Sequence, residues 1–341
     1  MLDQFGNQFR SFAKNECNNS SPLYEHLAYQ IAEDEELLLI AKDAANGQPV
    51  PNLLFAAVHY LLLTYKDDDL ADFYPSFTTT PKPQDSVYPF FKKFVLSHAH
   101  EVKTILQEWL VQTNEIRRCA YLYPMMTEIY QKHRMPLAFI EIGASAGLQL
   151  AMDQYNYCYN QTLSVRNSPT KLVLASENMG VALPPSVTQQ FVVSQRIGID
   201  LNPMDVTNEK DVAWLQALIW PEHHERRTLL NTAIPILQQL DVQLYKGDAI
   251  ECLAKISRQI DQDLMIVIYH THVANQIPLK LKHALIERLK EISLERPLYH
   301  CYNNLFDLQL HQDFLHQGEI KSIRTIDQPD GHAKWFKWAN E

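Results

Sequence analysis

The sequence predicts a doubly wound α/β domain with a mostly parallel sheet, preceded by an all-helical domain. In roughly the first 134 residues, apolar side chains recur mostly at helical spacing, and Ser21 before Pro22 is typical of a helix start. From Pro136 onward the pattern changes to short continuous apolar runs that alternate with helical patterns. Such runs are typical of strands buried on both faces of a parallel sheet. We therefore expect a helical domain over residues 1–134 and an α/β domain over residues 135–341.

The composition is that of an ordinary folded, enzyme-like chain. Of its 341 residues 46% are hydrophobic and 21% charged, and the formal net charge is −10. This charge opposes binding to phosphate backbones, so nucleic acid is disfavoured as a substrate. The sequence shows no signal peptide and no apolar stretch of membrane-spanning length, and its five cysteines form no CxxC pair. We expect a soluble, cytoplasmic protein without a disulfide framework, a zinc cluster or a membrane partner.

Five apolar runs in the second half predict the parallel strands. They are Leu137–Ile142, Ile197–Asp200, Val242–Tyr245, Leu264–Tyr269 and Pro297–Cys301. Helical patterns such as Glu222–Leu240 and Ile277–Ile292 lie between them. Near the C-terminus, Gly318–Ile326 and Ala333–Trp338 flank the turn Pro329-Asp330-Gly331, which predicts an antiparallel hairpin added to the sheet.

A turn of small residues, Gly143-Ala144-Ser145-Ala146-Gly147, follows the first predicted strand. Small residues let a strand turn tightly into a helix and let a ligand approach the backbone. The helical run Leu148–Tyr155 comes next, so free amides and the helix dipole would favour a carboxylate or a phosphate at the turn. A structural turn without a ligand is the alternative.

A carboxylate at the tip of the second strand would accept the two hydroxyls of a nucleotide ribose. Asp200, followed closely by Asn202, has this local position. It lies 53 residues beyond the glycine turn, where a dinucleotide site has about 20, so we expect an insertion over roughly residues 157–194. That insertion is expected to hold a hairpin that includes Lys171–Ser176. If this segment were instead the second strand, Glu177 would be the ribose ligand.

The order Glu141-x-Gly143-x-Ser145-x-Gly147 resembles motif I of the S-adenosylmethionine-dependent methyltransferases. Five parallel strands followed by a terminal hairpin are also the layout of class I of that superfamily, a Rossmann-like fold. The resemblance implies that Glu141 helps to organise the methionine end of the cofactor. Gly247-Asp248-Ala249 resembles the turn with which many methyltransferases bind the adenine amino group through an aspartate. A plain helix N-cap is the competing interpretation of Asp248, and the two roles can coexist.

Polar residues at the end of the fourth predicted strand are candidates for the chemistry. Ligands of open α/β sheets bind at the carboxyl ends of the strands, so His270 and His272 are candidate proton acceptors or substrate contacts. No strong third ligand accompanies them, and we expect no metal. Asn114, Glu115 and Arg117 precede an amphipathic stretch and are either a helix start or part of a lid that binds substrate.

Two further groups of polar residues have simpler explanations. Glu222-His223-His224 is a dense ionisable cluster at the start of a predicted helix, and such clusters are usually a solvated first turn. His59 lies in an otherwise apolar helical pattern, where a hydrogen-bonded core histidine is expected.

The chain resembles, over nearly its full length, a mainly bacterial family called domain of unknown function 2332. The matching segments are Ser20–Tyr24, Pro51–Tyr60, Gln112–Glu115, Glu141–Gly147, Gly198–Pro203, Trp220–His223 and Gly247–Ala249. Membership implies a methyltransferase-like core preceded by a helical domain, and it supplies no substrate. His272 departs from the family pattern, which is more often apolar at that position.

These observations predict an S-adenosylmethionine-dependent methyltransferase that acts on a small molecule. The expected cofactor ligands are Glu141, Gly143, Ala144, Ser145, Gly147, Asp200, Asn202, Asp248 and Ala249. His270 would lie near the methyl acceptor, and Asn114, Glu115, Arg117 and His272 would contact substrate. A nicotinamide-dependent oxidoreductase and a non-catalytic metabolite-binding or interaction protein are the alternatives, since one fold hosts many chemistries.

Overall fold

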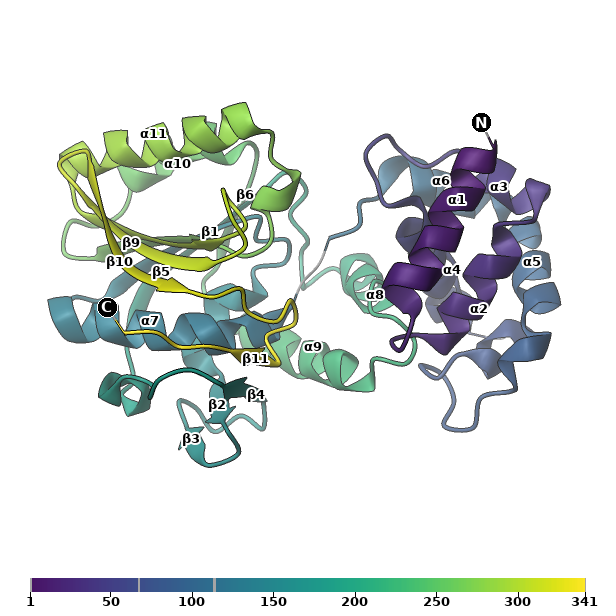
Figure 1. The fold of residues 1–341 in the computed structure, drawn as a ribbon, viewed down its shortest axis with the longest axis horizontal. Helices are drawn as coiled ribbons and strands as arrows, with labels where there is room; N and C mark the ends of the chain where they lie inside the picture. Colours follow the sequence, from purple (N-terminus) through teal and green to yellow (C-terminus); the bar gives the residue numbers. More distant parts are fainter. Residues whose placement is uncertain (1, 67, 113–114, 341) are drawn as a thin grey trace. The chain divides into compact units, whose positions relative to one another are not determined.

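The computed structural model describes residues 2–66, 68–112 and 115–340. The chain forms two compact units: a helical unit of residues 1–113 and 207–228, and an α/β unit of residues 114–206 and 229–341 (Figure 1). Residues 207–228 therefore belong to the helical unit, and residues 114–134 belong to the α/β unit. The sequence predicted a single boundary after residue 134. None of the helices in the described parts is both long and apolar enough to cross a membrane.

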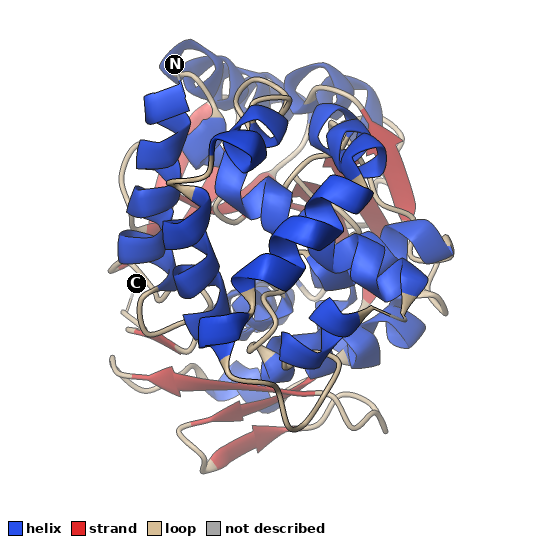
Figure 2. Cartoon of the chain, turned by 90° about the vertical axis from the view of Figure 1, so that its right-hand side faces the viewer, coloured by secondary structure: helices blue, strands red, loops and turns tan. Residues whose placement is uncertain are grey.

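The helical unit contains helices and loops, as Figure 2 shows. Its elements are α1 (Leu2–Phe12), a π-helical turn (Ala13–Cys17), α2 (Pro22–Ile31), α3 (Glu35–Ala41), α4 (Val50–Tyr65), 3-10 turns at Asp69–Phe73 and Gln84–Ser86, α5 (Tyr88–Ser97), α6 (Ala99–Glu108), α8 (Glu209–Ala217) and the start of α9 (His224–Leu237). The predicted helix start is confirmed, because Ser21 caps α2 by accepting a hydrogen bond from the Tyr24 amide at 3.2 Å. The rings of Tyr24 and Phe55 stack in its core, with centroids 4.2 Å apart.

The α/β unit is built on a seven-stranded sheet in the order β10-β9-β8-β7-β1-β5-β6. Its strands are β1 (Leu137–Ile142), β5 (Val193–Asp200), β6 (Gln243–Lys246), β7 (Met265–His270), β8 (Leu298–Asn303), β9 (Leu310–His316) and β10 (Glu319–Ile326). The first five are parallel, and β9 and β10 continue the sheet as antiparallel neighbours. The predicted mixed α/β fold with a mostly parallel sheet is therefore confirmed.

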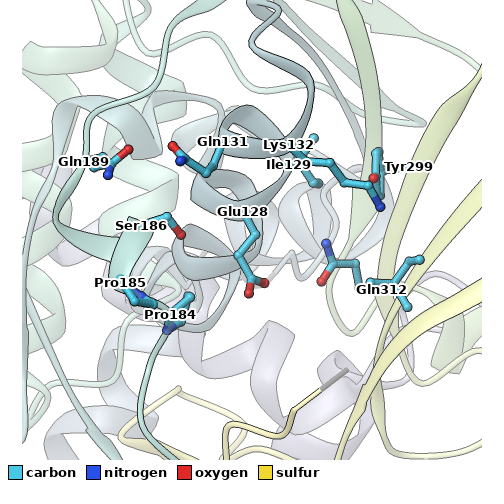
Figure 3. A pocket seen from close by; sticks show the side chains of 11 residues that line it. Glu128, Ile129, Gln131, Lys132, Pro184, Pro185, Ser186, Gln189, Tyr299 and Gln312 are labelled. Atoms are coloured by element: carbon cyan, nitrogen blue, oxygen red, sulfur yellow. The ribbon is translucent and has the colours of Figure 1, made fainter.

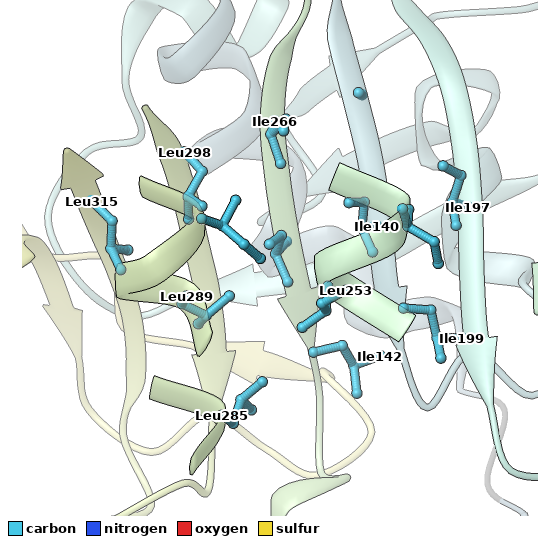
Figure 4. Close-up of a cluster of buried hydrophobic side chains, with 14 of the residues drawn as sticks. Ile140, Ile142, Ile197, Ile199, Leu253, Ile266, Leu285, Leu289, Leu298 and Leu315 are labelled. Atoms are coloured by element: carbon cyan, nitrogen blue, oxygen red, sulfur yellow. The ribbon is translucent and has the colours of Figure 1, made fainter. Parts of the chain in front are cut away.

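Helices cover both faces of this sheet. On one face α10 (Ala249–Ser257) and α11 (Leu279–Glu295) pack their apolar side chains on isoleucines of the central strands, among them Ile140, Ile266 and Ile268 (Figure 4). On the other face lies α7 (Cys119–His133), preceded by the 3-10 turn Ile116–Arg118. Successive side chains of a strand point to opposite faces of the sheet, so neighbouring residues of one strand pack against different helices.

A second, four-stranded sheet in the order β11-β4-β2-β3 packs on the opposite side of α7. It contains β2 (Asn156–Tyr159), β3 (Leu163–Val165), β4 (Val173–Asn178) and β11 (Trp335–Phe336), with the 3-10 turn Pro185–Thr188 after β4. The Tyr159 hydroxyl donates to the Ala120 carbonyl of α7 at 2.8 Å, and the rings of Tyr157 and Tyr123 stack at 4.2 Å. Because α7 is enclosed between two sheets, its first nine residues are all buried.

The structure corrects the prediction of the terminal hairpin. The strands that pair are β9 and β10, joined at Gln317 and Gly318, which both have positive φ angles (54° and 79°). The predicted partner Ala333–Trp338 instead supplies β11, which runs parallel to β4 in the small sheet. The predicted hairpin around Lys171–Ser176 is also wrong: β2 and β3 form a hairpin, and β4 joins β2 in parallel.

The helix predicted after the glycine turn is also corrected. Leu148–Gln154 is a 3-10 segment with a non-helical residue, Ala151, inside it. Its chain leads at once into β2 of the small sheet, so no regular α-helix forms there. The dipole argument that the sequence suggested therefore does not apply to this turn.

Candidate functional site

The glycine turn folds back on the end of β5. The Gly143 amide donates to the Ile199 carbonyl at 2.8 Å, and Gly143, Ser145 and Gly147 all have positive φ angles, of 69°, 49° and 75°. Ser145 is a non-glycine residue in this left-handed region, which costs conformational energy. Its side chain is buried, and its Oγ has no hydrogen-bond partner among the described residues.

Asp200 holds the turn in place. Its Oδ2 accepts a hydrogen bond from the Ser145 amide at 2.7 Å, and its Oδ1 accepts one from the Asn202 amide at 2.8 Å. Strand β5, which ends in Asp200, pairs with β1 in the main sheet, whereas Glu177 is an exposed residue of β4 in the small sheet. Of the two carboxylates, Asp200 thus lies at the turn and Glu177 lies in the other sheet, and the binding of a ribose by Asp200 stays a prediction.

Glu141 at the end of β1 is a buried carboxyl group, with 5% of its surface exposed. Burial raises the pKa of Glu141 well above its usual value, the nearby charge of Asp200 raises that pKa further, and Arg118 lowers it. Its Oε2 has no hydrogen-bond partner in the described part of the chain. A cation placed beside Glu141 would therefore favour its ionised form and satisfy a buried oxygen.

The small residues of the turn are also required by packing within the chain. A Cβ added at Gly143 would collide with the side chain of Val273, and one added at Gly147 would lie 3.3 Å from Leu244. At Gly198 of β5, the added Cβ would approach Leu244 Cδ2 at 2.5 Å. At these positions the close neighbour is thus another part of the protein, which supports the structural interpretation of the glycine pattern beside the ligand-binding one.

Asp248 is an N-cap. Its Oδ1 accepts hydrogen bonds from the amides of Ile250 at 2.8 Å and Glu251 at 3.3 Å, so it stabilises the start of α10, whose first residue is Ala249. The preceding Gly247 donates its amide to the Asp200 carbonyl at 2.9 Å. The ends of β5 and β6 are thus tied together, and the expected contact of Asp248 with adenine stays a prediction.

His270 lies on the opposite face of the sheet from Glu141. Its ring contacts His300 and Tyr302, at centroid distances of 5.1 and 5.7 Å, on the α11 side. In register Glu141 pairs with Tyr269, the residue before His270, so the alternation of side chains separates the two predicted site residues. Burial, followed by the charge of Lys282, lowers the pKa of His270 to about 3. In this state His270 is a weak proton acceptor.

A polar network on the α7 side of the same edge joins the predicted Glu115 to residues that the sequence did not predict. Gln149 Nε2 donates to Thr271 Oγ1 at 3.1 Å and to the Glu115 carbonyl at 3.4 Å. Arg118 Nε donates to the Gly331 carbonyl at 3.0 Å, and His332 Nδ1 lies 3.1 Å from Glu115 Oε2. Arg118, Gln149 and His332 come from distant parts of the chain, and no local pattern marks them.

Of the predicted substrate contacts, Glu115 belongs to this network and Arg117 is buried beside it. Asn114 lies outside the described residues. The His272 amide donates to Asn303 Oδ1 at 2.7 Å. Burial, followed by the charges of Arg118 and His332, lowers the pKa of His272 to about 4. We call the whole group the carboxyl-edge cluster: Glu115, Arg118, Glu141, Ser145, Gln149, Asp200, Thr271, His272, Asn303 and His332.

The acidic and histidine cluster of the helical unit has a structural role. Glu222 accepts hydrogen bonds from the Ser21 hydroxyl at 2.7 Å and the Leu23 amide at 3.0 Å, and His223 Nε2 lies 3.0 Å from the Ser20 hydroxyl. These contacts cap the start of α2. His59, as expected, is a hydrogen-bonded core histidine, 3.1 Å from the Ala217 carbonyl and 2.9 Å from the Ser76 hydroxyl.

Within residues 2–66, 68–112 and 115–340, no three His, Cys, Asp or Glu side chains are arranged to hold a metal ion. A cavity of about 380 Å³ lies beside the C-terminal half of α7, and none of the residues expected to bind cofactor or substrate lines it. The carboxyl-edge cluster is a candidate ligand site because of its buried polar and charged groups. A bound ligand would supply hydrogen bonds and charge to these groups.

Comparison with known proteins gives a family and no named relative. Residues 6–338 match the model of a family described as "Uncharacterized protein conserved in bacteria (DUF2332)". Because the match covers nearly the whole chain, the protein belongs to this family. No curated protein and no solved structure matches the chain.

Proposed function

We propose that this member of the family is an S-adenosylmethionine-dependent methyltransferase of a small molecule, with a Rossmann-like core that binds the cofactor at the carboxyl-edge cluster. The observation that carries the proposal is Glu141, a buried carboxyl group with an unpartnered oxygen next to a carboxylate fixed on the turn. Leaving a buried polar atom unpaired costs free energy, and such atoms concentrate where a ligand is bound.

The residues at this edge fit the charges of the cofactor. Its methionyl end carries an ammonium group and a sulfonium, which Glu141 would bind, and its ribose hydroxyls would donate to Asp200. The Ser145 and Asn202 amides hold the Asp200 carboxylate in a fixed orientation at the turn. When bound, the cofactor supplies an activated methyl group. The task of the protein is to align the acceptor and to remove a proton where one is released.

A non-catalytic metabolite-binding protein is the second candidate. The low pKa of His270 and its position on the other face of the sheet favour this alternative, because they leave the cluster without the expected proton acceptor. The side chain of Val273 also favours this alternative, because it packs against Gly143 and occupies space that a ligand would use at the glycine turn. Under this proposal the same carboxylates bind a cationic metabolite and no group is transferred.

Calorimetric titration with S-adenosylmethionine, S-adenosylhomocysteine and NAD tests the proposal. We expect both adenosyl ligands to bind and NAD not to bind. The Glu141→Gln variant should weaken S-adenosylmethionine binding at least about 100-fold, because a buried charged contact is lost. The matched control is Glu177→Gln, which alters an exposed carboxylate in the small sheet and should leave the affinity unchanged.

The same titration reports protonation. Because the pKa of free Glu141 is raised, a bound cation should release a proton from it, and the heat of binding should depend on the ionisation enthalpy of the buffer. Glu141→Gln should abolish that dependence. Absence of binding at about 1 mM of either adenosyl ligand would reject the cofactor. Binding without methyl transfer to any acceptor in a broad panel would favour the second candidate.

A further inference from the structure

The cavity beside α7 is a second concave site in the α/β unit, and it lies outside the carboxyl-edge cluster. Its volume is about 380 Å³, within the range of roughly 300–1,000 Å³ that is usual for small-molecule pockets. One wall is the C-terminal half of α7, another is the segment Pro184–Ser186, and the third is formed by β8 to β10 (Figure 3). Glu128 of α7 lies between the second and third of these walls.

Glu128, which lines the cavity, forms an ion pair with the buried Arg324. The guanidinium of Arg324 donates to both carboxylate oxygens of Glu128 and to Gln312 Oε1, the last at 3.2 Å. Arg324 Nε donates to the Ala339 carbonyl at 2.6 Å, and the guanidinium lies 4.2 Å from the Trp338 ring centroid. The charge of Glu128 is therefore neutralised by a cation that the surrounding contacts hold in place.

Lys132 lines the cavity and forms no ion pair with any residue that the structure describes. It stands four residues after Glu128 on α7, the spacing at which the two would normally form an ion pair, but Glu128 is engaged by Arg324. The Lys132 ammonium lies over the ring of Phe314, 6.0 Å from the ring centroid. The charges of Lys132, Arg324 and Glu128 add up to one net positive charge, on a chain whose formal charge is −10.

Apolar and amide groups complete the lining. Ile129, Pro184, Pro185 and Ile323 provide apolar surface. Ile323 lies at a register shift between β10 and β9, and such bulges redirect a side chain locally. The amides of Gln131, Gln189 and Gln312 also line the cavity, and because Gln312 Oε1 accepts from Arg324, its NH₂ group is the part left to donate to a ligand.

We propose that this cavity binds a small organic monocarboxylate with an apolar body. The carboxylate pairs with the Lys132 ammonium and accepts hydrogen bonds from the glutamine amides, while the apolar body packs on the isoleucine and proline side chains. A single net positive charge matches a monoanion better than it matches a phosphate dianion. The inference is independent of the proposed methyltransferase function, because the two sites share no residue.

Benzoate and hexanoate are suitable probes, with benzamide and hexanamide as neutral counterparts of the same shape. We expect each carboxylate at about 10 mM to shift amide resonances of the cavity residues in the intact protein, and the neutral amides to bind at least about tenfold more weakly. Lys132→Gln should weaken the carboxylates by about tenfold or more. Lys171→Gln, an exposed lysine before β4, is the matched control and should leave binding unchanged.

The inference would be overturned by no binding of either carboxylate at this concentration, by equal binding of the carboxylates and their amides, or by unchanged binding to the Lys132→Gln variant. Inorganic phosphate that binds more tightly than benzoate would also overturn it. Lys132 is exposed, so its variant should fold, and a circular dichroism spectrum identical to that of the wild type verifies this. The affinity of the carboxyl-edge cluster for S-adenosylhomocysteine should be the same in both lysine variants, which separates the two sites.

Discussion

Glu141 and His270 end neighbouring strands of one sheet, and both are buried, yet their surroundings differ. Glu141 lies on the α7 face with an anion, Asp200, and a cation, Arg118, close enough to affect its pKa. His270 lies on the α11 face against the rings of His300 and Tyr302, and its charged neighbour is Lys282. Both of its ring nitrogens lack a partner in the described parts of the protein.

The comparison teaches that burial at a strand end is not by itself a sign of chemistry. In both residues burial is the largest cause of the pKa shift, and it favours the neutral form. Only Glu141 belongs to a polar network that a ligand charge could change, since Asp200 and Arg118 already act on it. His270 is held against aromatic rings beside Lys282. Burial and the charge of this lysine both oppose the protonation of His270. The following experiments test this difference.

Glu141→Gln should give the largest effect, and its sign depends on pH. The pKa of Glu141 in the folded protein is raised well above the value of 4.5, so above that pH the unfolded chain loses a proton that the folded chain keeps. The stability of the wild-type protein therefore falls as pH rises, while the glutamine variant is spared this loss. We expect the stability gap between the two proteins to widen in favour of the variant as pH rises above 4.5. Denaturant unfolding at a series of pH values measures this gap, and a gap that does not widen with pH would contradict it.

His270→Phe should act at the other end of the pH scale. The pKa of His270 is lowered from 6.5 to about 3, so between these values the unfolded chain binds a proton that the folded chain does not. Wild-type stability attributable to this residue is complete above pH 6.5 and is lost as pH falls. The phenylalanine variant should lose on the order of 3 kcal/mol less than the wild type between about pH 7 and pH 3.5. Parallel stability curves for the two proteins would show that the pKa of His270 is not lowered in the folded protein.

Asp200→Ala should have an intermediate effect on stability. Its carboxylate accepts the Ser145 and Asn202 amides, and its loss leaves two backbone donors of the turn without this partner. We expect a loss of about 1–3 kcal/mol in the free energy of unfolding. Glu177→Ala is the control, with a change within about 0.5 kcal/mol, because its side chain is exposed. Equal effects of the two substitutions in chemical denaturation would argue against a role of Asp200 in holding the turn.

Asp248→Ala should have the smallest effect, because it removes one helix cap. The expected loss is about 1 kcal/mol in the free energy of unfolding. Adenosyl-ligand affinity distinguishes the two predicted roles of this residue: a cap alone leaves the affinity nearly unchanged, whereas a contact with adenine lowers it markedly. Asp248→Asn, which retains an oxygen for capping, separates the two roles further.

The central strands could be predicted because each is a continuous apolar run, as Leu137–Ile142 illustrates. A strand that is buried on both faces has to consist mainly of apolar residues. The terminal hairpin was misplaced for the opposite reason. β9 has the sequence Leu-His-Gln-Asp-Phe-Leu-His, which is largely polar, and its turn at Gln317 and Gly318 is less conspicuous than Pro329-Asp330-Gly331. The segment Ala333–Trp338 instead forms β11 because it pairs with β4, a strand far away in the sequence. The local sequence does not encode this pairing.

The candidate site was predictable only in part. Glu141, Ser145 and Asp200 could be found because a turn and strand tips mark them locally. The separation of His270 from Glu141 depends on the register between β1 and β7, which pairs Glu141 with Tyr269. A shift of one residue would reverse it, and no feature of either strand alone fixes that register. Arg118, Gln149 and His332 were missed because only the folded chain brings them together.

The contact between Glu115 and His332 joins residues 217 positions apart in the sequence. The short strand β11 pairs with β4 and so holds the segment around His332 in the small sheet. This rim of the edge is complete only when the contacts of Arg118 with Gly331 and of Glu115 with His332 have both formed. Because contacts between residues far apart in the sequence pay a large loop-closure entropy, we expect the polar rim to assemble after the core beneath it.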